Sequence, residues 1–139
     1  MMKKMLNIRG QRGGAAIEFA IVLPVLVVLL FGIIEFSTFL YDKAVITNAS
    51  REGARAGIRF NGPTAEEVED VVDNYCAGNL ITFGSETDIT TVASGVGGAS
   101  GTPCTVTVTY NYGFLVLPNF ISELSGGINL TAQTVMRNE

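Results

Sequence analysis

The sequence has no histidine and no tryptophan, and only two of its 139 residues are cysteines. Without histidine, a histidine-based catalytic triad and a histidine-ligated metal site are excluded, and two thiols are too few for a cysteine-only zinc site. Charged residues make up 16% of the chain, and the net charge of −4 has the wrong sign for a general nucleic-acid binder. We therefore expect no cofactor, no metal and no nucleic-acid partner.

Charge is distributed very unevenly along the chain. The first twelve residues contain no acid and four bases, namely Lys3, Lys4, Arg9 and Arg12. From Ala15 to Tyr41 the chain is almost entirely apolar and is interrupted only by Glu18 and Glu35. After Phe60, nine acids accompany a single base. The sequence thus consists of a basic tip, an apolar segment and an acidic remainder.

The apolar segment is long enough to cross a membrane as a helix. Phe19–Ile34 is uncharged, and its extension to Tyr41 exceeds a hydrocarbon core of about 30 Å. The positive-inside rule then predicts that Met1 is cytoplasmic and that the acidic head lies outside. A secretory signal peptide also joins a basic to an apolar region, but this segment is longer, carries Glu18 near its start and lacks a small-residue cleavage site. We expect a single-pass membrane protein.

The helical pattern continues past the apolar segment. Pro24 removes one backbone donor and should loosen the helix one turn earlier. Small residues recur every four positions and allow another helix to approach closely: Ala49, Gly53 and Gly57. A parallel stripe of bases has the same spacing: Arg51, Arg55 and Arg59. We predict that the helix ends near Asn61-Gly62-Pro63, where three helix-breaking residues follow one another.

Residues 62–139 are expected to form a small α+β head with one short helix and an antiparallel sheet. Thr64 and Glu67 match a capping box, and the apolar face that follows predicts a helix stopping at Gly78. Period-two alternation marks the strand Thr105–Tyr112, and Leu130–Met136 and Asp88–Ala93 are weaker strand candidates. Residues 114–124 are expected to form a loop with a short helix.

The two cysteines lie on the outer side of the predicted membrane span. In an oxidising compartment, Cys76 and Cys104 are best interpreted as one structural disulfide. It would close a loop of roughly 28 residues and contribute about 3–4 kcal/mol on the chain-entropy model. A redox-active pair is a poor alternative because no C-x-x-C motif is present.

The stretch Arg9–Ala20 reads RGQRGGAAIEFA, and Glu18–Pro24 reads EFAIVLP. A basic leader, small glycines and a lone carboxylate just inside an apolar helix resemble a class III signal, the kind cut by a prepilin peptidase. Together with Glu35-Phe36 and SREGAR at Ser50–Arg55, the sequence resembles the TadE-like pseudopilins of the tight-adherence (Tad/Flp) branch of type IV pilus systems. The resemblance covers residues from Arg12 to about Arg59.

The resemblance implies cleavage immediately after a glycine. Cleavage between Gly13 and Gly14 makes Glu18 the fifth residue of the mature chain, the usual position in the family, and cleavage between Gly14 and Ala15 makes it the fourth. We favour the first bond, which divides the chain into a leader (1–13), a transmembrane and extended helix (14–61) and a head (62–139).

Each acid of the apolar helix has two interpretations. An ionised carboxylate in hydrocarbon costs at least a few kcal/mol, so Glu18 needs a partner or a polar position. The new α-ammonium of Gly14, in the same or a neighbouring subunit, could neutralise Glu18 and set the register between helices; the alternative is a glutamate reaching the cytoplasmic interface. Glu35 lies about 25 Å further along an ideal helix. Its position suits the opposite interface, with a second registration contact as the alternative.

We expect a noncatalytic minor pilin-like subunit, with membrane lipid, a prepilin peptidase, other pilin or pseudopilin subunits and the Tad assembly platform and ATPase as partners. The arginine stripe could dock on acidic heads of neighbouring subunits, or its members could pair within the chain, for instance Arg55 with Glu52. A major filament-forming pilin and a permanent bitopic protein with a ligand-binding head are the alternatives.

Overall fold

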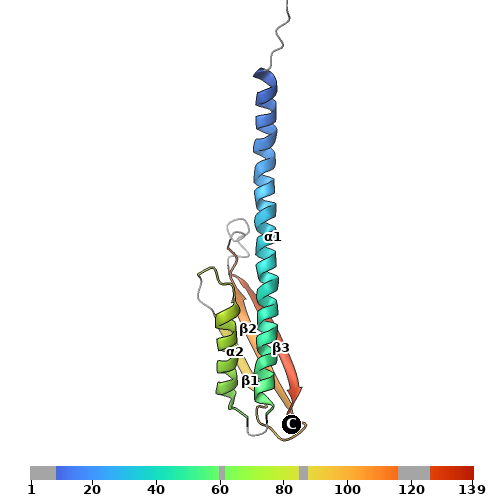
Figure 1. The fold of residues 1–139 in the computed structure, drawn as a ribbon, viewed down its shortest axis with the longest axis vertical. Coiled ribbons are helices and arrows are strands. Elements are labelled where there is room, and N and C mark those ends of the chain that lie inside the picture. Colours follow the sequence, from blue (N-terminus) through green and yellow to red (C-terminus); the bar gives the residue numbers. More distant parts are fainter. Residues whose placement is uncertain (1–8, 60–61, 85–87, 116–125) are drawn as a thin grey trace, which may run out of the picture. The chain divides into compact units, whose positions relative to one another are not determined.

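A computed structural model describes residues 9–59, 62–84, 88–115 and 126–139. The elements are two helices followed by three strands: α1 (Arg9–Gly57), α2 (Ala65–Asn79), β1 (Ile89–Ser94), β2 (Pro103–Tyr112) and β3 (Ile128–Arg137) (Figure 1). This arrangement confirms the predicted α+β class. Residues 116–125, which contain most of the predicted loop with a short helix, lie outside the described residues.

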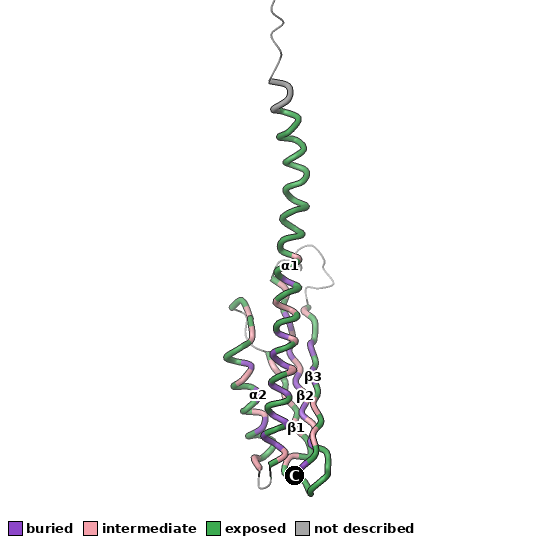
Figure 2. The backbone as a smooth tube through the Cα atoms, turned by 45° about the vertical axis from the view of Figure 1, so that its right-hand side comes forward, coloured by how far each residue is buried: buried purple, intermediate pink, exposed green. Residues whose placement is uncertain are grey.

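Packing divides the chain into two units, Met1–Ile34 and Glu35–Glu139. In the first unit, every described residue from Gly13 to Phe31 is exposed, as the green part of α1 shows in Figure 2. Helix α1 is the one helix in the described part of the chain that is long and apolar enough to cross a membrane. From residue 15 to residue 34 it already has about 20 residues, the length that a bilayer requires.

In the second unit, the last part of α1 belongs to the head. Residues 35–57 make about six helical turns, and apolar side chains from these turns pack against the sheet and α2. The helix ends at Gly57, earlier than the predicted Asn61-Gly62-Pro63. Its last carbonyls find partners outside the helix, because the Gly57 oxygen accepts from Gly97 N–H at 3.0 Å and the Ile58 oxygen accepts from Glu139 N–H at 3.3 Å.

The three strands form an antiparallel sheet in the order β1-β2-β3. All three strands that the alternating pattern predicted are present, and β2 is the central one. The register pairs Tyr110 with Ile89 on one side and with Leu130 on the other. Alternate residues of β2 are fully or almost fully buried: Cys104, Val106, Val108, Tyr110 and Tyr112. The opposite face of the sheet carries mainly threonine, asparagine and glutamine.

Helix α2 begins with the predicted capping box. Glu67 N–H donates to the Thr64 hydroxyl at 3.3 Å, and Thr64 N–H donates to the Glu67 carboxylate at 2.7 Å. Its buried face is Val68, Val72 and Cys76. The helix continues one residue past the predicted stop at Gly78, to Asn79.

The core lies between the buried face of the sheet and the two helices, and α1 contributes Ile46, Ala49 and Ala54 to it. Gly53 permits the close approach of α1 to α2, because a Cβ atom there would lie 2.5 Å from Cγ2 of Val72 and 3.3 Å from Cγ1 of Val106. Carbon atoms pack at about 3.5–4.0 Å, so the position has no room for a side chain.

Candidate processing and assembly region

The predicted cleavage region lies in the exposed first turns of α1. Gly13, Gly14, Ala15 and Glu18 are all helical and exposed. A Cβ atom at either glycine would have no atom within 4 Å, so neither glycine is required by local packing. Small residues without neighbours leave the backbone open to approach by another protein. The geometry leaves the choice between the two candidate bonds open.

The exposed surface after Glu18 is apolar on every side of the helix. Phe19, Ile21, Val25 and Ile33 are 57–67% exposed, and each turn between them adds further large apolar side chains. Exposed apolar patches of this size on a soluble monomer are rare and indicate contact with lipid or protein. Pro24 lies inside this segment and cannot donate to the carbonyl oxygen four residues earlier.

Glu35 is held inside its own chain. Its side chain is 3% exposed, and its carboxylate accepts a hydrogen bond from Leu115 N–H. Its backbone carbonyl accepts from the hydroxyls of Thr38, at 2.8 Å, and Tyr112, at 3.3 Å. Burial is the main cause that raises the pKa of Tyr112, so this hydroxyl stays protonated at neutral pH. Glu35 therefore ties α1 to the segment after β2 where the chain enters the head.

Asp42 is a second buried acid on α1, and the sequence analysis did not single it out. Its side chain is fully buried; Oδ1 accepts from Ile81 N–H at 2.9 Å, and Oδ2 has no partner among the described residues. Burial raises the pKa of Asp42 above 3.8, and the hydrogen bond from Ile81 opposes that shift. The sequence feature that indicates burial of Asp42 is its spacing: Glu35, Asp42 and Ala49 are seven residues apart and share one face of a helix.

The small residues that recur every four positions along α1, which we call the small-residue ridge, pack within the head. Ala49, Gly53 and Gly57 are buried, and atoms of α2 and β2 surround the two glycines. A Cβ at Gly57 would lie 3.0 Å from the Cys104 sulfur and 3.5 Å from Cγ2 of Val68. The surface of α1 between residues 49 and 57 that permits close helix packing is therefore occupied by the chain itself.

The arginine stripe is exposed and makes no ion pair within the described ranges. Arg51 donates weakly to Asn48, with its Nη1 3.5 Å from Oδ1, and the Glu52–Arg55 pair is not formed. Arg59 lines a hollow of about 350 Å³ together with the glycine-rich loop and Glu139. The stripe is free to contact another molecule.

The predicted disulfide is absent, and both cysteines are free, fully buried thiols. Cys104 lies close to Val68, because the Cys104 sulfur and Cγ2 of Val68 are both near the position that a Cβ atom at Gly57 would occupy. Cys76 is eight residues further along α2, about 12 Å on an ideal helix. A disulfide requires Cα atoms within about 7 Å of each other, so this packing separates the two thiols too far.

Comparison with known proteins finds one family model that is similar to the N-terminal part of the chain. Residues 13–55 match the family model described as TadE-like protein, which confirms the resemblance to TadE-like pseudopilins. No curated protein and no solved structure matches the chain. The match begins at the predicted cleavage region, continues through the exposed apolar segment and ends at Arg55. The match covers 43 of the 139 residues.

Proposed function

We propose that this protein is a minor pilin-like subunit of a Tad pilus system, cleaved by a prepilin peptidase between Gly13 and Gly14 and assembled through α1. One observation carries the proposal: the segment that matches the TadE-like family starts with residues whose side chains are exposed on every side of the helix. A helix with an all-apolar, uncovered surface is stable in lipid or against similar helices, and a pilin uses both environments in turn.

The charge distribution supports an inner-membrane orientation with the leader in the cytoplasm and the head in the periplasm. The leader carries four bases and no acid, which favours its retention on the cytoplasmic side. Its removal leaves five bases against thirteen acids, a side-chain charge of −8. Cleavage therefore releases the element that anchors the cytoplasmic end and leaves a chain suited to leave the bilayer.

Glu18 sets the register between neighbouring helices in this proposal. Cleavage at Gly13 creates an α-ammonium at Gly14, about one helical turn from the carboxylate of Glu18. An ion pair between the amine of one subunit and Glu18 of the next removes the cost of a lone carboxylate in hydrocarbon. Glu35 does not need such an intermolecular partner, because its carboxylate already accepts a hydrogen bond within the head.

The partners follow from this sequence of events. The prepilin peptidase acts on the leader, the assembly platform and its ATPase extract the mature chain, and other pilin or pseudopilin subunits receive its apolar helix. The exposed bases Arg51, Arg55 and Arg59 are available to acidic heads of neighbouring subunits. Lipid covers the same helix before assembly.

The test is Glu18→Ala in cells that express the pilus system, with Glu52→Ala as the matched control on the exposed surface of the same helix. Cleavage is measured as the mass of the membrane-extracted chain, and assembly as crosslinking to other subunits. We expect Glu18→Ala to be cleaved but to lose its crosslinks, while Glu52→Ala retains both properties. Crosslinking of Glu18→Ala at the wild-type level would refute the registration role, and loss of cleavage would assign Glu18 to peptidase recognition instead. High abundance of wild-type chain in sheared surface fibres would favour a major pilin.

A further inference from the structure

The head has an apolar surface at the end where α1 enters it. Six large apolar side chains that are 37–62% exposed lie there, and we call them the apolar collar: Phe36, Leu40, Tyr41, Ile81, Phe83 and Leu115. Three segments that are distant in sequence contribute to the collar. A scatter of single exposed apolar residues is ordinary, whereas a cluster drawn from three segments indicates a contact surface.

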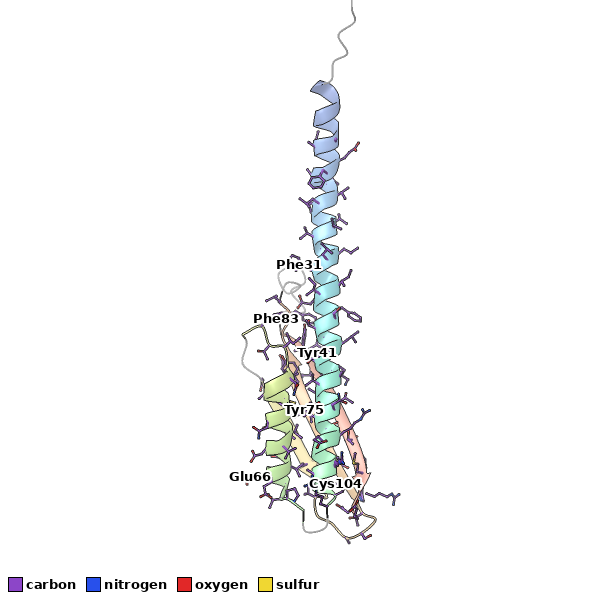
Figure 3. The ribbon with its side chains drawn as sticks, in the orientation of Figure 1. Phe31, Tyr41, Glu66, Tyr75, Phe83 and Cys104 are labelled. Atoms are coloured by element: carbon purple, nitrogen blue, oxygen red, sulfur yellow. The ribbon has the colours of Figure 1, made fainter. Side chains whose placement is uncertain are left out.

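Hydrogen bonds place these segments at the same end of the head. Leu115 N–H donates to the carboxylate of Glu35, and Ile81 N–H donates to Asp42, so both segments are fixed beside the first two turns of α1 within the head. In Figure 3, Phe83 and Tyr41 lie toward one end of the head, and Glu66 and Cys104 lie toward the other.

The two acids that α1 contributes at this end point inward, whereas Asp88, whose carbonyl accepts from Asn111 N–H, is exposed. Glu35 and Asp42 are 3% and 0% exposed, so the outward side of residues 36–41 presents Phe36, Leu40 and Tyr41 to the surroundings. The opposite end carries exposed charges, including Arg55, Arg59 and Glu66. The exposed surface of α1 within the head therefore changes from apolar, where the chain leaves the apolar segment, to charged near the end of the helix.

We infer that the apolar collar is immersed in the interfacial layer of the same bilayer that α1 spans before assembly, so that the head rests on the membrane surface. Lipid is the occupant because the chain enters the head at Glu35, one residue after the exposed apolar segment ends at Ile34. The collar therefore starts where a spanning helix leaves the hydrocarbon. Aromatic side chains are favoured at this depth. The inference rests on the proposed membrane span and adds a second lipid contact to it.

The absence of tryptophan from the chain allows a direct test by fluorescence. Phe83→Trp and Leu115→Trp place a probe in the collar, at residues that are 48% and 53% exposed. Val135→Trp places a probe at a residue of similar exposure, 57%, on the outer face of β3. Phe31→Trp probes the predicted span. Each full-length variant is reconstituted in vesicles of phosphatidylcholine and phosphatidylglycerol with or without brominated acyl chains, and burial of the two thiols is checked to confirm that the head is folded.

We expect brominated lipid to cause a loss of emission from the probes at Phe83, Leu115 and Phe31, and no loss from the probe at Val135. Quenching at Phe31 without quenching at either collar position would overturn this inference and leave the proposed function intact. Absence of quenching at all four positions would overturn both. A third outcome is that bromine does not quench the collar probes but their emission shifts to shorter wavelength as the protein-to-lipid ratio increases. This result would show that the collar contacts a second protein, and it would also overturn the inference.

Discussion

Gly53 is the position where the packing of the head makes its most quantitative prediction. A methyl group added by Gly53→Ala would lie 2.5 Å from Cγ2 of Val72, at least about 1 Å inside a normal carbon contact. Such overpacking costs about 1–3 kcal/mol. Alanine also recovers about 1 kcal/mol of helix propensity relative to glycine. We expect a net loss of about 0–2 kcal/mol in the free energy of unfolding of the head.

Gly78→Ala is the matched control. Gly78 is also helical, and a Cβ atom there would have no atom within 4 Å. The control therefore isolates the propensity effect and should stabilise the head by up to about 1 kcal/mol. The difference between the two variants reports the steric cost at Gly53.

The two buried thiols provide the assay. Cys76 and Cys104 both lie in the core of the head, so their alkylation in pulses across a urea series reports unfolding of the head alone. In a double-mutant cycle, Val72→Ala should cost less stability in the Gly53→Ala background than in the wild type, with a coupling of about 1 kcal/mol or more. If Gly53→Ala stabilised the head as much as Gly78→Ala does, the close approach of α1 to α2 would be refuted.

Two further predictions concern buried groups. Because burial raises the pKa of Asp42 in the folded head, the folded state binds more protons than the unfolded chain, and the stability contributed by this group falls as the pH rises from 3.8 toward the raised pKa. Asp42→Asn should abolish that fall, because the amide has no acidic proton to lose and its oxygen still accepts from Ile81 N–H. In urea titrations the variant should gain stability over the wild type from about pH 4 to pH 7. If the free energies of unfolding of the two proteins changed in parallel with pH, this prediction would be wrong. Without reductant, quantitative alkylation of the denatured chain should detect two free thiols. The folded chain should react slowly, because burial raises the pKa of Cys76 to about 11. A denatured chain with no free thiol would contradict this packing.

Local signals in the sequence were sufficient to predict the apolar helix and the main elements of the head. The capping box at Thr64 and Glu67, the alternation along Thr105–Tyr112 and the long apolar segment each depend on residues close together in the chain, and the structure contains all three. These features follow from backbone hydrogen bonding and periodicity, which short windows of sequence record.

The partners of the buried acids and the separation of the cysteines depend on contacts between distant segments. Glu35 and Asp42 are buried because their partners, Leu115 and Ile81, come from segments 80 and 39 residues away. Sequence spacing likewise gave no distance between the cysteines, since that distance depends on which turn of α2 lies beside Cys104. The small-residue ridge indicated close packing, but only the folded head shows that α2 and β2 are its partners.

The N-terminus of the membrane-extracted chain tests the central claim most directly. Intact mass measurement and N-terminal sequencing of protein from a strain with an active prepilin peptidase should give a chain that starts at Gly14 and remains embedded in lipid. Protein that keeps Met1 or Met2 in the presence of the active peptidase and still supports pilus formation would contradict the account.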